Sequence, residues 1–222
     1  LHAFDWVCPD GHRRYQGPSG ICAECGKETK KDVVWIPKTN PQSTSYCFDQ
    51  EPHFQYFNAF KKHPDYKKSL EETSLTESMS IQGSCFMMTR DKYWELNICD
   101  ELFGSWGSQG IEVACKTWLS GGRVVINHKT WYAHMFRTQG GDFSFPYQNP
   151  QSKVQNAKKT ARELFFDNKW EKQIRPLSWL VEKFWPVPGW TEENLAKIKS
   201  WPLQNKQETP KPSVGILYYT DN

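Results

Sequence analysis

Residues 103–127 read FGSWGSQGIEVACKTWLSGGRVVIN, and this stretch decides the fold. Within it, Ile111 and Cys115 recur at helical spacing, with an apolar residue one turn later, which predicts a helix over residues 109–119 with one buried face. Two consecutive glycines then end the helix, and the apolar run at residues 123–127 predicts a strand. A helix followed directly by a buried strand is typical of an α/β fold.

The rest of the chain extends this pattern on both sides. Residues 33–36 and 131–136 predict strands, the apolar run 80–88 predicts a buried strand, and residues 41–65 predict a loop with aromatic anchors. Thr89 is a suitable N-cap for a helix over residues 90–96. Further segments complete the prediction: a loop at 138–150, helices at 153–170, 177–184 and 192–199, and a linker at 204–212. This order favours a mixed sheet with helices rather than a helix bundle.

Composition places the chain among globular proteins. Aromatic residues make up 15% of the 222 residues, which a disordered chain would lack. The net charge is only +3, so charge gives no support for a nucleic-acid partner. No apolar run is long enough to span a bilayer, and no signal peptide is visible, so we expect no membrane association. The odd number of seven cysteines favours reduced thiols and a cytoplasmic, bacterial or phage protein.

Three cysteines and one histidine crowd the first 25 residues. Cys22 and Cys25 are spaced so that two thiolates on a tight turn can grip one ion, and Cys8 with His12 forms a looser pair. Three thiolates and one imidazole suit a closed, structural zinc site. The alternative is that Cys8 and His12 are incidental and that the other two cysteines are a reduced pair. The adjacent Arg13-Arg14-Tyr15 could serve as an adaptor surface or be solvated.

The segment around residues 82–137 carries groups that suit a sugar site. The loop before the helix contains Trp106 between glycines, and an indole face packs on the apolar face of a pyranose ring. An acidic residue, Glu112, lies near the start of the helix, and a carboxylate accepts hydrogen bonds from sugar hydroxyls. Gly83 precedes Ser84, and its missing Cβ allows close approach by a ligand or by backbone.

Several motifs in this segment resemble, in order, the second half of a GT-A glycosyltransferase. The resemblance is closest to the polypeptide N-acetylgalactosaminyltransferases and the wider family-2 transferases, and it covers about residues 78–170. The motifs that carry it are Gly83-Ser84-Cys85-Phe86-Met87-Met88, Tyr93-Trp94-Glu95-Leu96, Asp100-Glu101, Trp106-Gly107-Ser108-Gln109-Gly110, Trp118-Leu119-Ser120-Gly121-Gly122-Arg123 and His134-Met135-Phe136-Arg137. The resemblance implies a partial GT-A fold with a Rossmann-like mixed sheet. The zinc ribbon predicted from the cysteine spacing would then be an N-terminal insertion, and C-terminal helices would follow the transferase half.

The resemblance also implies roles for particular residues. His134 would be a ligand of the divalent metal, Mn²⁺ or Mg²⁺, that holds the diphosphate of a nucleotide-sugar donor. Arg137 would neutralise that diphosphate, because a guanidinium can bind phosphate through two hydrogen bonds. Trp106 would line the sugar site, and Gly83 and Ser84 would contact the substrate. The loop at 138–150 would close over the donor and exclude water.

Two departures from the family pattern bear on activity. The acidic residue expected after Trp-Gly-Gly is Gln109 here, and a glutamine cannot act as a base, so Glu112 is the substitute candidate for a catalytic carboxylate. The nucleotide-binding half, with its Asp-x-Asp or Asp-x-His motif, would precede Leu1, so we expect this part to be inactive alone. The alternative function is a non-catalytic zinc-ribbon adaptor or a carbohydrate-binding module on a degenerate transferase scaffold, and the acceptor is unknown.

The domain organisation follows from these assignments. Residues 1–38 are expected to form the zinc ribbon, and residues 39–187 the transferase half with trailing helices. A short helix and linker would occupy residues 188–212. The apolar run at residues 213–219 predicts a strand with no partner in this chain, so residues 213–222 are interpreted as the start of a truncated following domain.

Overall fold

The computed structural model describes residues 2–37, 44–104, 107–134 and 151–201, and the backbone of residues 215–219. These residues form a mixed α/β structure, as the sequence predicts. The chain divides into two compact units: residues 1–40 with residues 133–135, and the remainder. The predicted loop at 138–150 and the predicted linker at 204–212 lie outside the described residues.

The first unit is a small antiparallel sheet with the strand order β2-β1-β3. Its strands are β1 (Ala3–Val7), β2 (Arg13–Tyr15) and β3 (Lys30–Trp35). The strand predicted at residues 33–36 is confirmed as the second half of β3, apart from its last residue. The sheet offers little apolar burial, since only Ala3, Cys8 and Cys22 are buried among residues 2–37.

The second unit holds a three-stranded sheet with the order β6-β7-β8. Strand β6 (Leu75–Glu77) is antiparallel to β7 (Arg123–Asn127), and β8 (Gly215–Tyr219) is parallel to β7. Strand β7 is confirmed as predicted. The prediction that the strand near residue 215 has no partner is wrong, because β8 pairs with β7 along its whole length. A parallel partner about 90 residues away leaves no local signal in the sequence.

The segment predicted as a loop contains a hairpin, so that prediction is wrong for this part. Strand β4 (Tyr46–Phe48) pairs with β5 (Phe54–Tyr56) in antiparallel register. Asp49 organises the turn: its Oδ1 accepts hydrogen bonds from the backbone N–H groups of Glu51 (2.8 Å) and His53 (3.0 Å). Such local side-chain bonds are the reason that Asp initiates turns.

The helices agree with the prediction except near residues 64 and 161. Thr89 caps α2 as predicted, since its hydroxyl accepts a hydrogen bond from the backbone N–H of Lys92. The predicted helix at 153–170 instead ends in a π-helical turn, η3 (Arg162–Phe166), and α1 was not predicted. The α-helices of the described residues are α1 (Pro64–Thr73), α2 (Arg90–Glu95), α3 (Gln109–Leu119), α4 (Gln151–Ala161), α5 (Leu177–Lys183) and α6 (Glu192–Lys199). Short 3₁₀ turns are η1 (Asn58–Lys62) and η2 (Glu101–Phe103).

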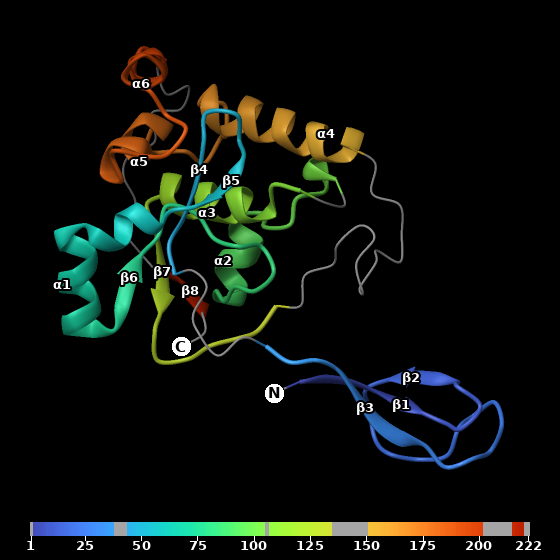
Figure 1. The fold of residues 1–222 in the computed structure, drawn as a ribbon. Helices are drawn as coiled ribbons and strands as arrows, with labels where there is room; N and C mark the ends of the chain where they lie inside the picture. The colour runs from blue at the N-terminus through green and yellow to red at the C-terminus, as the bar shows by residue number, and fades with distance from the viewer. Residues whose placement is uncertain (1, 38–43, 105–106, 135–150, 202–214, 220–222) are drawn as a thin grey trace. The chain divides into compact units, whose positions relative to one another are not determined.

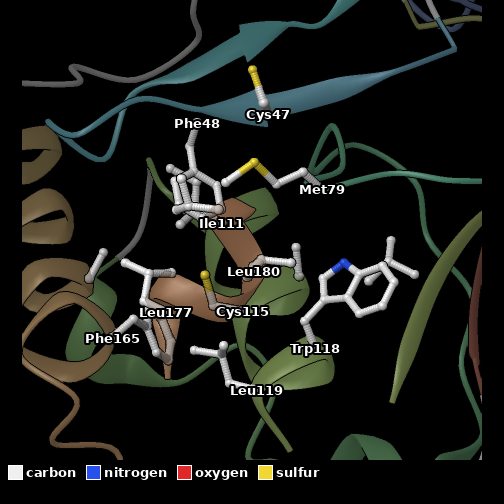
Figure 2. Packing of buried hydrophobic residues seen from close by; sticks show 14 of the residues in the cluster. Cys47, Phe48, Met79, Ile111, Cys115, Trp118, Leu119, Phe165, Leu177 and Leu180 are labelled. Carbon is white, nitrogen blue, oxygen red and sulfur yellow. The ribbon is translucent and has the colours of Figure 1, made fainter. Parts of the chain in front are cut away.

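Helix α3 is the centre of the second unit (Figure 1). Ten of its eleven residues are buried, which exceeds the single apolar face that the sequence spacing predicts. Figure 2 shows Ile111, Cys115 and Leu119 packed among side chains of α5, while Phe48 of β4 points toward Ile111. Cys47, which precedes Phe48 on β4, points to the opposite face of the strand, because side chains alternate along a strand.

Two predicted strands are absent from the described residues. Residues 80–88 form an irregular segment with a turn at 83–84, although Ile81 is fully buried as a strand residue would be. The described part of the second, residues 131–134, is also irregular. The first prediction is wrong, because the backbone of residues 81–83 lies against the first turn of α3 and only Met87 of this segment takes part in a β-bridge. No helix among the described residues combines the length and hydropathy that a membrane crossing needs.

Candidate functional site at the start of helix α3

Two glycines fit the irregular segment 81–83 against the first turn of α3. A Cβ on Gly110 would lie 2.0 Å from the carbonyl oxygen of Ile81, well inside contact distance. A Cβ on Gly83 would lie 3.1 Å from the Cβ of Gln109 and 3.1 Å from the backbone nitrogen of Gly110. The close approach that the sequence indicates at Gly83 is therefore an approach of backbone to the helix.

The substitution Gly110→Ala is expected to destabilise the second unit by about 1–3 kcal/mol, because backbone must move to admit the new methyl group. The measurement is the urea midpoint of unfolding. Gly104→Ala is the control for a glycine with open space around it, although its positive φ of 77° adds strain of its own. A Gly110→Ala variant as stable as the parent would contradict this packing.

Gln109 is held at the start of α3 by a neighbouring loop. Its Nε2 donates a hydrogen bond to the Sγ of Cys99 at 3.1 Å. Its Oε1 lies 3.2 Å from the position that a Cβ on Gly83 would take. The thiol of Cys99 also forms a hydrogen bond with the Tyr93 side chain, and this hydrogen bond raises the pKa of the tyrosine. The amide is therefore fixed between the loop and the segment that contains Gly83.

Glu112 lies in a buried ionic cluster three residues further along the helix. Its Oε1 accepts hydrogen bonds from the Nζ of Lys116 (2.9 Å) and from the backbone N–H of Asp100 (3.0 Å). The Lys116 side chain is fully buried, and its Nζ also donates to the carbonyl of Asn97 (2.6 Å) and the carboxylate of Asp100 (3.3 Å). Burial raises the pKa of Glu112. The cluster ties the loop at residues 97–100 to α3.

A second polar group includes the two chain neighbours of Gly83. The hydroxyls of Ser84 and Tyr132 are 2.8 Å apart, and the Tyr132 hydroxyl donates to the Oε1 of Gln82 at 3.1 Å. Ser84 is exposed, whereas Gln82 and Tyr132 are half-buried. The sequence motifs include Ser84 but give no signal for Tyr132, because their contact joins residues 48 positions apart in the chain.

Of the three residues assigned to the nucleotide-sugar donor, the structure describes only His134. Trp106 and Arg137 lie outside the described residues. His134 lies in the irregular segment after β7, and partial desolvation lowers the pKa of its imidazole. A lowered pKa favours the neutral ring at neutral pH, which is the form that binds a metal.

The four predicted zinc ligands come together in the first unit. The ligand atoms of Cys8, His12, Cys22 and Cys25 all lie within 4.8 Å of one another. The Nδ1 of His12 is 3.5 Å from the Sγ of Cys8 and 3.7 Å from that of Cys22, and the Sγ atoms of Cys8 and Cys25 are 3.5 Å apart. Zinc bonds of about 2.3 Å to sulfur and 2.0 Å to nitrogen give tetrahedron edges of about 3.5–3.8 Å, so the donor set fits this ion.

The surroundings of the four ligands also suit a metal. Backbone N–H groups of Cys25 and Glu24 hydrogen-bond the Cys22 sulfur and lower its pKa to about 7, which favours the thiolate. The Nε2 of His12 lies 3.6 Å from a carboxylate oxygen of Glu24. A carboxylate on the second ring nitrogen orients a metal-bound histidine with its other nitrogen toward the ion.

Comparison with known proteins identifies the class of the region that contains α3. The chain contains a glycosyltransferase-like region, and the resemblance to polypeptide N-acetylgalactosaminyltransferases is confirmed. No protein-family model matches the chain. No solved structure matches it significantly.

The relatives are curated animal proteins. The putative polypeptide N-acetylgalactosaminyltransferase 13 of Drosophila melanogaster is 32% identical over 135 residues, which cover 61% of this chain and 22% of the relative. Polypeptide N-acetylgalactosaminyltransferase 5 of Mus musculus is 26% identical over 107 residues, which cover 45% of this chain and 11% of the relative. Polypeptide N-acetylgalactosaminyltransferase 3 of Drosophila melanogaster is 22% identical over 168 residues, which cover 63% of this chain and 25% of the relative. The chain thus spans a quarter or less of the length of each of these relatives.

Proposed function

We propose that residues 78–170 are the acceptor-side half of a metal-dependent nucleotide-sugar glycosyltransferase with a GT-A fold. The observation that carries this proposal is the similarity to N-acetylgalactosaminyltransferases over most of the chain. Because the chain spans only part of these relatives, the proposal includes an upstream nucleotide-binding half. The relatives' names favour an N-acetylhexosamine as the sugar and a polypeptide as one candidate acceptor.

The proposed donor contacts follow the motif order. We assign Trp106 to the sugar and Arg137 to the diphosphate, and we assign Gly83, Ser84 and Gln109 to the substrate. His134 would hold Mn²⁺ or Mg²⁺, and its lowered pKa suits that role. The bound ion would act as a Lewis acid toward the departing diphosphate.

The two catalytic candidates are assigned different roles. Gln109 is fixed at the start of α3, and its amide can donate and accept hydrogen bonds but cannot accept a proton in catalysis. Glu112 is 1% exposed and its carboxylate already accepts two hydrogen bonds inside the protein. We therefore assign Gln109 to substrate positioning and Glu112 to holding the loop at residues 97–100.

The first unit is proposed to be a structural zinc ribbon, residues 1–38, attached to the transferase half at residues 39–187. The closed set of four ligands leaves no open position, and such sites are structural rather than catalytic. All seven cysteines are free thiols, and a reducing compartment keeps thiols in this form, which supports a cytoplasmic location.

The direct test is release of UDP from UDP-N-acetylgalactosamine by the full-length protein. We expect saturable release that requires Mn²⁺ or Mg²⁺ and stops when EDTA removes the ion, because the donor diphosphate needs a countercharge. EDTA can also strip the zinc cluster, so restored activity after adding Mn²⁺ with zinc is the necessary control. Failure to release UDP or to bind the nucleotide would contradict the proposal.

A non-catalytic carbohydrate-binding module is the second candidate, and Gln109 is the observation that favours it. The variant Gln109→Glu restores the acidic residue of the family pattern, whereas Gln109→Ala removes the amide. If the protein is an enzyme that uses Gln109 for positioning, we expect Gln109→Ala to lower kcat/KM for UDP release about tenfold, the effect of one lost hydrogen bond. If the protein is a binding module, we expect neither the parent nor Gln109→Ala to release UDP, although Gln109→Ala keeps a thermal midpoint near that of the parent.

A further inference from the structure

Three polar side chains meet beside the start of α3, and we call them the hydroxyl–amide cluster: Gln82, Ser84 and Tyr132. Tyr132 is its centre, with its hydroxyl 2.8 Å from the Ser84 hydroxyl and 3.1 Å from the side-chain Oε1 of Gln82. The cluster joins the turn at residues 83–84 to the segment after β7. No motif in the sequence indicates it.

Fold stability alone gives a weak reason for this arrangement. Ser84 is exposed, and a hydrogen bond at the surface replaces bonds that both groups would make to water. The ring of Tyr132 has a different role from its hydroxyl, because the ring packs against the hydrophobic core of the second unit. A partly buried ring that packs on the core holds its hydroxyl in place, so fixing that hydroxyl costs little further entropy when a ligand binds.

The cluster is next to the proposed substrate site. Gly83 lies between Gln82 and Ser84 in the chain, and a Cβ on it would be 3.1 Å from the Cβ of Gln109. Gly83 is therefore close to the Gln109 side chain, and its two chain neighbours belong to the hydroxyl–amide cluster. Hydroxyl and amide groups both donate and accept hydrogen bonds, which matches the hydroxyls and the acetamide of an N-acetylhexosamine.

We propose that Tyr132, held by Ser84 and Gln82, is a specificity-determining residue that hydrogen-bonds the sugar of the donor. This inference rests on the proposed function and adds a residue to its site. A site built to hydrogen-bond a particular hydroxyl discriminates against a sugar that presents it differently, because its polar groups are then left unpaired. Tyr132 therefore sets the preference between epimeric N-acetylhexosamines.

The test compares UDP release from UDP-N-acetylgalactosamine and UDP-N-acetylglucosamine by the full-length protein. Tyr132→Phe removes only the hydroxyl, and Ser84→Ala removes its partner. We expect each variant to change the ratio of kcat/KM for the two donors about tenfold, the effect of one hydrogen bond. We expect the double variant to change the ratio no more than Tyr132→Phe alone, since the two hydroxyls act as one unit.

Tyr56→Phe is the matched control, because Tyr56 is an exposed tyrosine on β5 outside the cluster. It is expected to leave the ratio unchanged. A thermal midpoint close to that of the parent shows that Tyr132→Phe is folded, and Ser84→Ala carries the test if it is not. If the parent releases UDP and both variants keep its donor ratio within twofold, Tyr132 does not read the sugar, although the proposed function stands. If the parent releases no UDP from either donor, the proposed function fails and this inference fails with it.

Discussion

Removal of the proposed zinc ion from the cluster of Cys8, His12, Cys22 and Cys25 is expected to unfold residues 2–37 completely and to leave the second unit folded. The reason is the small core of the first unit, where the buried residues are Ala3 and two of the ligands themselves. Structural zinc contributes about 10–16 kcal/mol to the folding of small zinc domains, more than such a sheet can supply otherwise. The measurement is the dispersion of amide signals in a ¹H–¹⁵N spectrum before and after chelation.

The variant Cys22→Ser tests the same point without a chelator. It removes one thiolate and should abolish stoichiometric zinc binding together with the dispersed signals of β1 and β3. Cys99→Ser is the matched control, because Cys99 is exposed and lies outside the cluster. A first unit that keeps its dispersed signals without any metal would show that the four side chains meet for another reason.

Lys116→Met is expected to lower the free energy of unfolding by about 3–5 kcal/mol, since it leaves the buried carboxylate of Glu112 without its counterion. The Lys116 side chain has no exposure, and the Glu112 side chain is 2% exposed, so water cannot replace the lost partner. The measurement is urea unfolding followed by tryptophan fluorescence. The double variant Glu112→Gln with Lys116→Met removes both charges and should recover most of the loss.

The deficit of Lys116→Met should also depend on pH. Burial raises the pKa of Glu112 in the folded state, so the folded protein retains this proton more readily than the unfolded chain. The stability that such a group contributes is present below its ordinary pKa of 4.5 in the unfolded chain. It is lost as the pH rises through the higher pKa of the folded protein. We therefore expect a larger deficit at pH 8 than at pH 4.5. An equal deficit at both values would mean that the carboxylate is not the unpaired charge.

Features with local signals could be predicted from the sequence. Helix α3 was predicted with its observed bounds because its apolar spacing and the two glycines after it are both local. The capping hydroxyl of Thr89 placed the start of α2 in the same way. The four candidate zinc ligands were also found from spacing, since both of their turns are short in sequence.

Features that depend on distant partners could not be predicted. The apolar run at residues 80–88 predicts a buried strand, but only Ser80 and Ile81 are buried, and the backbone of residues 81–83 lies against α3. The pairing of β8 with β7 and the hydroxyl contact of Tyr132 with Ser84 both join segments far apart in the chain. The hairpin of β4 and β5 has a local signal in Asp49. Its strands are short and rich in aromatic side chains, however, so the sequence pattern resembles a loop with aromatic anchors.

Paramagnetic broadening by Mn²⁺ tests most directly whether the start of α3 faces a nucleotide sugar, as proposed. In the full-length protein with UDP-N-acetylgalactosamine, bound Mn²⁺ is expected to broaden the signals of Gly83 and Gln109 only when the nucleotide sugar is present. Broadening that is independent of the nucleotide sugar, or that spares both residues, would contradict the proposal.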